Sequence, residues 1–400
     1  MVTDYLKMRD FEKVRYLNIT ILYEERSGYF ALVGQRNQKI LLDKMSSKVD
    51  LDSVNRYLNE SAETLVRTMK SRRTSIASLP DLLCAPGIGL AARGYFTLKN
   101  IFGSSSDVFR ANDRSGALPF FEIKTDSFFI PWEWLYSEMP ENFSSESGLY
   151  SLAAKFWGLS HVVARESLNR NEFASHNGHN SATRAPALRV PPHVGLVLDR
   201  SLSFANFELD KLIELSERES IKLTQFEPAA GSSDYALIRD LNEFLSRDFD
   251  ILHFACHAKG DNSGLSSHFT VSREDKTAFE YQLAFLEGEP GVQIKSPLIF
   301  FNACSTASRN PEQTYNFVEM FLIQQASTDC MVAIESSVES QVAEDFSSAF
   351  YDNLLAGSPV GLAVYLTRNA LFRNMRRPED IVSLFYSIHG NADLAIDPRV

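Results

Sequence analysis

Two short apolar runs in the second half of the chain have the pattern of buried parallel strands. Residues 250–257 read DILHFACH and residues 297–306 read PLIFFNACST. Each run is apolar over several residues and polar at its carboxyl end, which is typical of a central strand in an open parallel sheet. Sites in such sheets lie at the carboxyl ends of the strands. The pattern therefore predicts a site that contains His257 and Cys304.

Strand and helix patterns alternate from about residue 191 to the end of the chain, which predicts βαβ units around a parallel sheet. We expect six strands in one doubly wound α/β unit, with helices between them and a loop or hairpin excursion at 260–296. Ser233 is a predicted helix N-cap and Gly357 a predicted helix C-cap. The expected strands are 194–199, 221–226, 250–257, 297–304, 330–334 and 381–388, and the expected helices include 204–219, 315–328, 342–355 and 359–373.

The amino-terminal part has a different pattern and predicts a second, α+β lobe over residues 1–168. Residues 17–24 and 29–33 suggest a hairpin, 52–70 a helix, and 120–130 further strand material. Trp132 and Trp134 lie in a dense aromatic run, which indicates buried packing. Residues 169–192 have the composition of a flexible linker, so 193–400 forms the other lobe, the one that contains His257 and Cys304.

Composition and charge narrow the function. The 400 residues are 44% hydrophobic with a formal net charge of −11, which argues against general nucleic-acid binding. Apolar runs are broken within about ten residues, short of the roughly 20 that span a bilayer. The first residues lack the layout of a secretion signal, so we expect a cytoplasmic protein that does not bind membranes. Four cysteines without a CxxC pair give no sign of a disulfide framework.

A cysteine and a histidine at neighbouring strand ends suggest thiol chemistry. A thiolate attacks carbonyl carbon, and an adjacent imidazole can accept its proton, provided that the strands carrying Cys304 and His257 are neighbours. His253 lies on the same strand face as His257; it either orients the dyad or is a buried histidine with one backbone partner. A zinc site built from these residues and Cys256 is disfavoured, because adjacent strand residues face opposite ways. We expect no metal and no cofactor.

Four segments carry a resemblance to a known family. Residues 253–258 (HFACHA) and 302–307 (NACSTA) resemble the histidine and cysteine motifs of CHAT-domain peptidases, which are caspase-like proteases related to caspases, separases and gingipains. Residues 130–135 (IPWEWL) resemble the family's proline-tryptophan-glutamate motif, and 350–357 (FYDNLLAG) its late helix. The resemblance implies a caspase-like, mostly parallel sheet of about six strands with helices on both faces, and a pseudo-caspase-like amino-terminal lobe.

The resemblance also implies an activity and the residues that perform it. Peptide-bond cleavage would use Cys304 as nucleophile and His257 as general base and then general acid. Backbone N–H groups of Ala258 and Cys304 would stabilise the oxyanion. The family normally has a glycine directly after the histidine, whereas this chain has Ala258.

Substrate preference is predicted from two acids that follow strands. Asp199 and Glu335 are expected on the same rim as the dyad, where they are either solvated or able to receive an Arg or Lys side chain. A pocket for basic residues would allow self-cleavage at Arg170, Arg184 or Arg189.

The partners are expected from the resemblance alone. It implies limited cutting of a partner protein in bacterial stress or antiphage defence, released by an upstream sensor or activator, with a gasdermin-type pore former as one substrate class. Two alternatives stay open: a catalytically silent interaction scaffold, and a thiol amidase that acts on small molecules.

Overall fold

The fold is known from a computed structural model of residues 1–400. It describes residues 15–24, 28–35, 38–41, 51–71, 79–102, 119–125, 130–140, 154–167, 187–229, 231–260, 266–273, 275, 277–288, 292–304, 317–323, 327–336, 338–373 and 378–397. Among these residues no helix has both the length and the apolar character needed to cross a bilayer.

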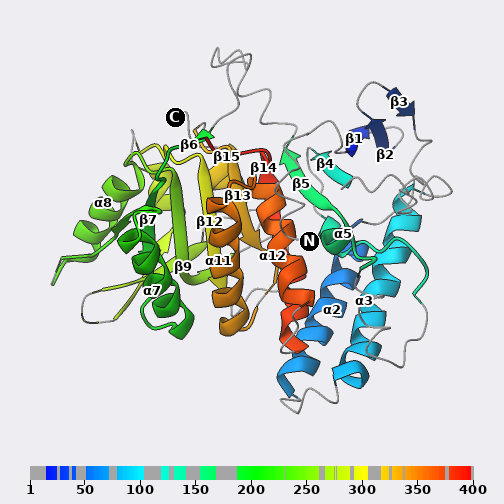
Figure 1. The fold of residues 1–400 in the computed structure, drawn as a ribbon, viewed down its shortest axis with the longest axis horizontal. Helices are drawn as coiled ribbons and strands as arrows, with labels where there is room; N and C mark the ends of the chain where they lie inside the picture. The colour runs from blue at the N-terminus through cyan, green and yellow to red at the C-terminus, as the bar shows by residue number, and fades with distance from the viewer. Residues whose placement is uncertain are drawn as a thin grey trace.

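In the part of the chain that the structure describes, six neighbouring strands of one larger sheet form the centre of the carboxyl-terminal half (Figure 1). Its strand order is β8-β7-β9-β12-β13-β14, and every neighbouring pair is parallel except β13 and β14. This confirms the expected open, mostly parallel α/β sheet. The strands are β7 (His193–Leu198), β8 (Lys222–Gln225), β9 (Ile251–Lys259), β12 (Leu298–Cys304), β13 (Cys330–Ile334) and β14 (Tyr386–Gly390).

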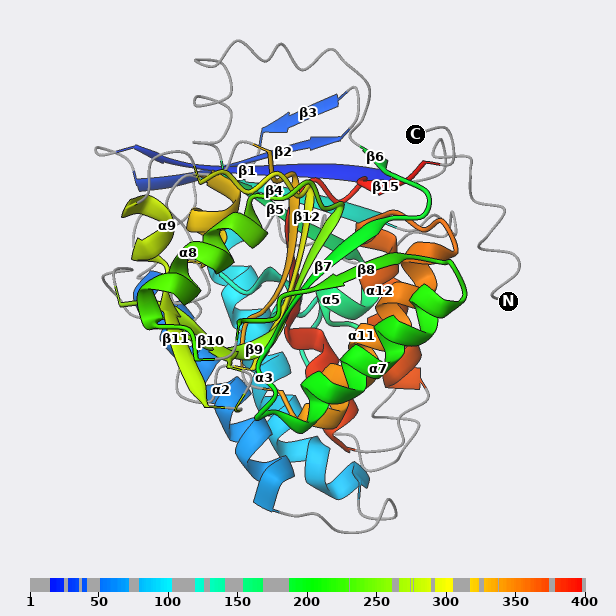
Figure 2. The ribbon, with the colours of Figure 1, turned by 90° about the vertical axis from the view of Figure 1, so that its left-hand side faces the viewer.

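Helices cover both faces of this sheet (Figure 2). One face carries α7 (Ser203–Glu217), α11 (Ser340–Leu355) and α12 (Val360–Arg373), and there Phe300 stacks on Phe350 with ring centroids 4.7 Å apart. The opposite face carries α8 (Asp234–Leu245), α9 (Ala284–Gly288) and the π-helical turn η5 (Glu319–Ile323), where Phe254 packs on Phe321 at 5.6 Å. The alternation of side chains along β9 and β12 divides the core between these two faces.

Local signals in the sequence set several element ends. The Ser233 side chain caps α8 by accepting a hydrogen bond from the Ala236 N–H at 3.3 Å. Gly357 follows α11 with φ 91°, a left-handed conformation that glycine adopts without steric cost. The expected excursion at 260–296 contains a hairpin of β10 (His268–Ser272) and β11 (Ala278–Gln282).

The last predicted strand is only partly correct. Residues 378–385 form the 3₁₀ helix η6 (Pro378–Phe385), and β14 begins only at Tyr386. Four of the five residues before Tyr386 are apolar, and all five are buried. A short, mostly apolar run fits a buried helix as well as a buried strand.

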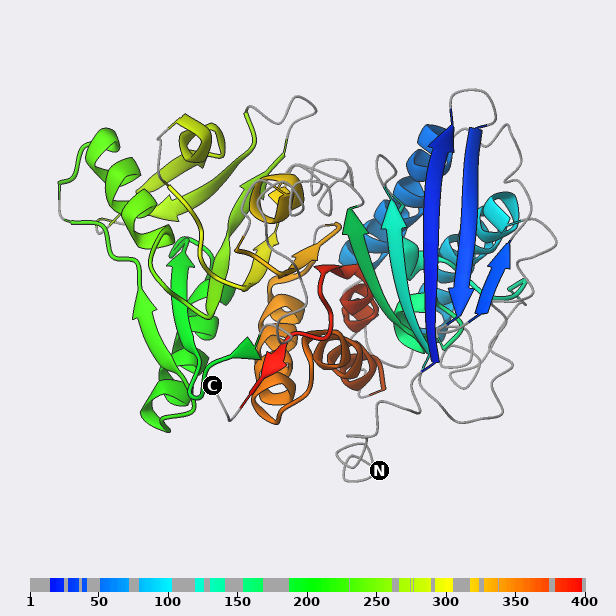
Figure 3. The same ribbon diagram turned by 90° about the horizontal axis from the view of Figure 1, so that it is seen from above.

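The amino-terminal half extends the same sheet. Strand β14 pairs in parallel with β5 through His389 and Arg165, so among the described residues one sheet of 13 strands runs through both halves (Figure 3). The predicted hairpin and helix are present as β1–β2 and α2. The elements are β1 (Arg15–Glu24), β2 (Gly28–Gln35), β3 (Gln38–Leu41), α2 (Leu51–Ser71), α3 (Leu79–Phe102), β4 (Pro119–Thr125), η4 (Trp132–Trp134), α5 (Trp157–Ser160) and β5 (Val162–Ser167).

The end of the predicted linker is a fixed part of the fold. Residues 168–186, with Arg170 and Arg184, lie outside the described residues. Strand β6 (Ala187–Leu188) pairs with β15 (Ala395–Ile396), and Arg189 directly follows β6. The Arg189 guanidinium contacts Asp250 at 2.8 Å and Asp248 at 3.0 Å, and its N–H donates to Asp250. The expectation of a flexible cleavage site at Arg189 is therefore wrong, because backbone and side chain are both held.

Candidate active site

The two strands that carry the predicted dyad are direct neighbours. Strands β9 and β12 pair in parallel, and the last partners in their register are His257 and Cys304. Paired strands lie about 4.8 Å apart, so the two backbones meet at the carboxyl edge of the sheet. The expectation that these strands are adjacent is thus confirmed. The His257 side chain is half-buried, whereas the Cys304 thiol lies outside the described part of the chain.

Strand alternation assigns the two positions to one face of the sheet. Phe300 and Asn302 belong to the face covered by α7 and α11, and position 304 is in phase with them. His253 and His257 are in phase on β9, and His253 contacts α7 on the same face. Cys256 is buried among the apolar residues of the opposite face. Because Cys256 lies on the face opposite His253 and His257, these residues are poorly placed to bind one zinc ion together.

Ala258, the predicted oxyanion residue, lies at the junction with the hairpin. It belongs to β9 and is paired with Phe269 of β10, and its side chain is buried. The hairpin thus adjoins the residue directly after His257. The oxyanion role of the Ala258 and Cys304 N–H groups stays a prediction.

Asp199 lies at the same edge, directly after β7. Its N–H donates to Ala255 of β9 at 2.9 Å, and its side chain is fully buried. One carboxylate oxygen, Oδ1, accepts from the Ser201 N–H at 3.0 Å, from the Ser201 hydroxyl at 2.6 Å and from the Ser272 hydroxyl at 3.0 Å. Within the described residues, Oδ2 has no hydrogen-bond partner. The alternative of a solvated rim acid is therefore wrong, and Asp199 has a buried oxygen available for a donor.

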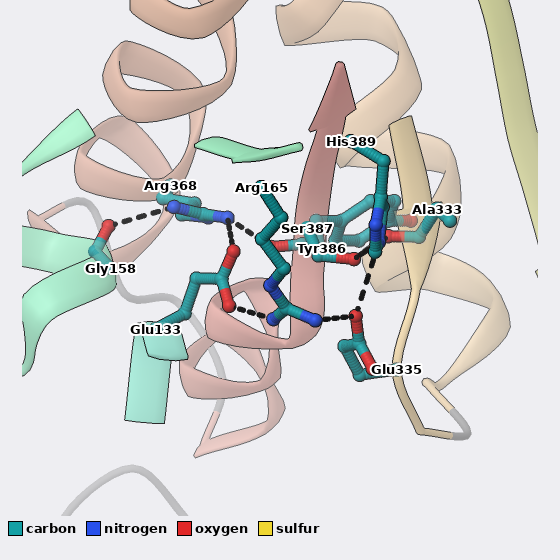
Figure 4. Close-up of polar contacts among 9 residues, drawn as sticks. All are labelled: Glu133, Gly158, Arg165, Ala333, Glu335, Arg368, Tyr386, Ser387 and His389. Carbon is teal, nitrogen blue, oxygen red and sulfur yellow. Dashed lines mark hydrogen bonds and ion pairs between the residues drawn. The ribbon is translucent and has the colours of Figure 1, made fainter. Parts of the chain in front are cut away.

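Glu335 has a different environment, although it follows β13 as predicted. Its carboxylate is buried and lies 2.8 Å from the Arg165 guanidinium and 3.5 Å from His389 (Figure 4). Burial acts to raise the pKa of Glu335, but the charge of Arg165 and the hydrogen bond from His389 outweigh it and hold the pKa below its ordinary value. Neither a solvated acid nor a free substrate ligand fits this position, because the carboxylate already pairs with Arg165 inside the protein.

Arg165 and Glu335 belong to a buried ion cluster that joins the two halves of the molecule (Figure 4). Glu133, from the tryptophan-rich turn η4, pairs with Arg165 of β5, and Arg368 of α12 lies 3.7 Å from Glu133. Burial lowers the pKa of Arg368 to about 10, so it keeps its charge at neutral pH. The sequence reasoning did not find this cluster; the one available signal was a glutamate inside the apolar run at 130–136.

His253 is buried, as one of the two sequence interpretations held, but its partners are side chains instead of a backbone group. Its Nε2 lies 2.5 Å from Glu208 and its Nδ1 3.0 Å from the Tyr351 hydroxyl. Burial lowers the pKa of His253 to about 3 and raises the pKa of Glu208 well above its ordinary value. Burial thus favours the neutral form of both groups, in which the Glu208 carboxyl donates to His253.

Asn302 extends this chain of hydrogen bonds toward the dyad, and the sequence reasoning missed it. Its amide donates to Glu208 and, at 3.1 Å, to the Ala343 carbonyl of α11. Its carbonyl accepts from the Tyr386 hydroxyl of β14 at 2.7 Å. A buried asparagine two positions before the cysteine was visible in the sequence, but its partners come from segments more than 40 residues away.

Replacing Glu208 with glutamine is expected to raise stability at neutral pH. Because burial raises the pKa of Glu208 above 4.5, the unfolded chain loses this proton at lower pH than the folded protein does. The wild type therefore loses stability, by up to about 1.4 kcal/mol per pH unit, as the pH rises from about 4.5 to the folded pKa. Glutamine has no proton to lose and keeps a donor and an acceptor.

Urea unfolding of both proteins over this pH range measures the effect. The variant should unfold at higher urea than the wild type at neutral pH, and the gain should vanish as the pH falls toward that of a free glutamate. A variant that is less stable at neutral pH would mean that Glu208 is charged in the folded protein.

Comparisons with known proteins agree with this fold. The family model described as CHAT domain matches residues 122–389. The *Saccharomyces cerevisiae* separase in a separase–securin complex is similar to the chain with a TM-score of 0.51 and 10% identity, over 99% of this chain and 31% of that one. The chain thus corresponds to about a third of the separase chain.

Two further structures are more distant. The Arg-specific cysteine proteinase gingipain R gives a TM-score of 0.47 at 9% identity, over 74% of this chain and 69% of that one. The *Drosophila* initiator caspase Dronc gives 0.27 at 11% identity, over 53% of this chain and 82% of that one. No functionally curated protein matches the sequence.

Proposed function

Because the chain belongs to the CHAT domain family, we propose that it is a cysteine endopeptidase with a Cys304–His257 dyad. The observation that carries the proposal is the register of β9 and β12, whose last paired residues are His257 and Cys304. Catalytic groups of open α/β sheets lie at such carboxyl ends. The caspase-like fold supports a protease of this class.

The proposed reaction follows from the two side chains. His257 accepts the thiol proton of Cys304, and the thiolate attacks the carbonyl carbon of the scissile peptide bond. The N–H groups of Ala258 and Cys304 stabilise the oxyanion. The carbon–nitrogen bond breaks, the imidazolium protonates the leaving amine, and an acyl-enzyme forms. Water, deprotonated by His257, then hydrolyses the thioester and restores the thiol.

Asp199 is the proposed selector for a basic residue before the scissile bond. Its buried Oδ2 lacks a partner among the described residues, while Oδ1 is fixed by Ser201 and Ser272. A guanidinium or ammonium group would supply the missing donor and neutralise the carboxylate. Glu335 is left out of this pocket, because the charge of its carboxylate is already neutralised by Arg165, which lies 2.8 Å from Oε1.

Replacing Asp199 with asparagine is expected to remove the preference for basic residues. The amide keeps an acceptor for Ser201 and Ser272 but loses the charge, so kcat/KM for Arg and Lys peptides should fall by about 10- to 100-fold. Fluorogenic peptides with Arg, Lys or Leu before the scissile bond measure the change. Glu227→Gln is the matched control, because Glu227 is an exposed acid near the same edge. An unchanged Arg preference in Asp199→Asn would remove Asp199 from the pocket.

The physiological substrate is proposed to be a partner protein that receives limited cuts, in bacterial stress or antiphage defence. A gasdermin-type pore former is one substrate class, and an upstream sensor or activator would release the protease. Self-cleavage at Arg170 or Arg184 would accompany activation. These proposals are supported by the resemblance of the histidine and cysteine motifs to those of CHAT-domain peptidases.

A silent interaction scaffold is the second candidate function. It is favoured by Ala258, which stands where the family has glycine and which pairs with β10. A peptide chloromethyl ketone with a terminal arginine, followed by peptide mapping, distinguishes the two. The peptidase should be labelled at Cys304 far faster than at Cys84. In a scaffold, Cys304 should react no faster than Cys84, and that result would end the case for proteolysis.

A further inference from the structure

A continuous chain of hydrogen bonds crosses the face of the sheet on which the dyad positions lie. It begins at the Tyr386 hydroxyl of β14, which donates to Asn302 of β12 at 2.7 Å. Asn302 donates to Glu208 of α7, which is joined to His253 of β9 at 2.5 Å. His253 in turn contacts the Tyr351 hydroxyl of α11 at 3.0 Å. All five side chains are buried.

When Glu208 and His253 are neutral, hydrogen-bond donation runs in one direction along this series, from Tyr386 to Tyr351. In the neutral form that burial favours, Glu208 has one O–H, which donates to Nε2 of His253, and one carbonyl oxygen, which accepts from Asn302. Neutral His253 then carries its proton on Nδ1 and donates to Tyr351. In this arrangement Glu208 and His253 carry no net charge, so the series of hydrogen bonds avoids the large penalty of an unpaired buried charge.

This series of hydrogen bonds connects β9 and β12, the two strands of the proposed dyad, to helix α7 close to the carboxyl ends of the strands. Asn302 precedes Cys304 by two residues, about 7 Å along the strand, and is in phase with it. His253 is in phase with His257 on the neighbouring strand. Glu208 contacts both Asn302 and His253, so one side chain of α7 holds both strands. A second anchor, from Asn302 to the Ala343 carbonyl at 3.1 Å, fixes β12 against α11.

We propose that Asn302, Glu208 and Tyr386 are positioning residues for the dyad. This inference rests on the proposed peptidase function. They fix the position and orientation of the end of β12 relative to β9. The distance and angle between the Cys304 and His257 side chains depend on that position. The register of the sheet determines only which residues are paired. A thiol and an imidazole at strand ends also need their backbones held closely, because a misplacement of about 1 Å can reduce rate about 100-fold.

The test measures alkylation of Cys304 by the arginyl chloromethyl ketone as a function of reagent concentration and pH. Asn302→Leu should lower the maximal inactivation rate about 10- to 100-fold, and Tyr386→Phe about 3- to 10-fold, with reagent affinity nearly unchanged. The pH midpoint of labelling should rise in both, because a displaced imidazole stabilises the thiolate less. Tyr386→Phe keeps the ring that stacks on Phe346 at 3.4 Å, so it tests the hydroxyl even where Asn302→Leu does not fold.

Three further variants separate positioning from stability. Glu208→Gln keeps one donor and one acceptor and should label within about 2-fold of wild type, whereas Glu208→Met should behave like Asn302→Leu. Thr367→Val removes a buried hydroxyl that accepts from Asn353 at 3.2 Å between α11 and α12. It should lower the unfolding midpoint without changing the labelling rate or its pH midpoint.

The outcomes distinguish failure of the positioning role from failure of the proposed peptidase function. A wild-type Cys304 that is no more reactive than Cys84 would refute the peptidase function, and the positioning role with it. A reactive wild type with unchanged rate and pH midpoint in folded Tyr386→Phe and Asn302→Leu would refute only the positioning role. Equal losses in Thr367→Val and Tyr386→Phe would also refute it, because the effect would then follow stability.

Discussion

Replacing Cys304 with alanine is expected to abolish peptide cleavage, with a loss of roughly 10⁴-fold or more in kcat. Without the sulfur no acyl-enzyme can form. His257→Ala should cost about 10²- to 10⁴-fold, because the base that deprotonates the thiol is lost. The two losses should not add, since the residues act as one unit. Cleavage of a peptide with an arginine before the scissile bond measures each loss.

Cys256→Ala is the matched control for the dyad variants. Cys256 directly precedes His257, but it is buried in the apolar cluster on the opposite face of the sheet. Its replacement removes one buried sulfur and should leave kcat unchanged. Substrate should still bind to Cys304→Ala, which would therefore capture its partner protein uncut. Equal cleavage by wild type and by both dyad variants would assign the activity to other residues.

Replacing Arg165 with methionine is expected to destabilise the protein by about 3–5 kcal/mol. The change leaves Glu335 buried with no arginine beside it and leaves Glu133 with Arg368 alone, 3.7 Å away. The cost is the desolvation of carboxylates that have lost their cation, which is larger than the benefit that the intact pair provides. Urea unfolding followed by tryptophan fluorescence measures it, because Trp132, Trp134 and Trp157 are buried in the same half.

Lys124→Met is the control for Arg165→Met. Lys124 of β4 pairs with Glu166 at 2.6 Å, but both side chains are partly exposed, so its loss should cost less than about 1 kcal/mol. Adding Glu335→Gln to Arg165→Met should restore part of the stability, since the amide needs no counter-charge. An Arg165→Met variant as stable as Lys124→Met would mean that the cluster is hydrated rather than dry.

The elements that follow strict patterns could be predicted from the sequence. The strand at 330–334, the N-cap Ser233 and the ending of α11 near Gly357 agree with the structure, because each depends on residues within one turn or one strand. The 3₁₀ helix before Tyr386 was missed for a related reason. A short buried apolar run has no period that separates helix from strand, so the surrounding packing decides its conformation.

The roles of the buried acids depended on contacts that the sequence does not reveal. Asp199 and Glu335 both follow strands, yet Asp199 meets two serines and Glu335 meets an arginine 170 residues away. Arg189 looked exposed in a polar stretch, yet Asp250 holds it. Apart from Ser201, which is two residues from Asp199, these partners are distant in the sequence. A charge pattern along the chain gives no measure of distance in space.

The sequence by itself determined the parallel α/β class, the two strands with a histidine and a cysteine at their ends, and the family. These follow from apolar periodicity and from motifs of six to eight residues, which are local. Only the tertiary structure decided that β14 and β5 join both halves into one sheet, that Arg165 neutralises Glu335, and that Glu208 contacts both strands that end in the predicted dyad. Burial makes these partners necessary, because polar groups removed from water need a donor, an acceptor or an opposite charge.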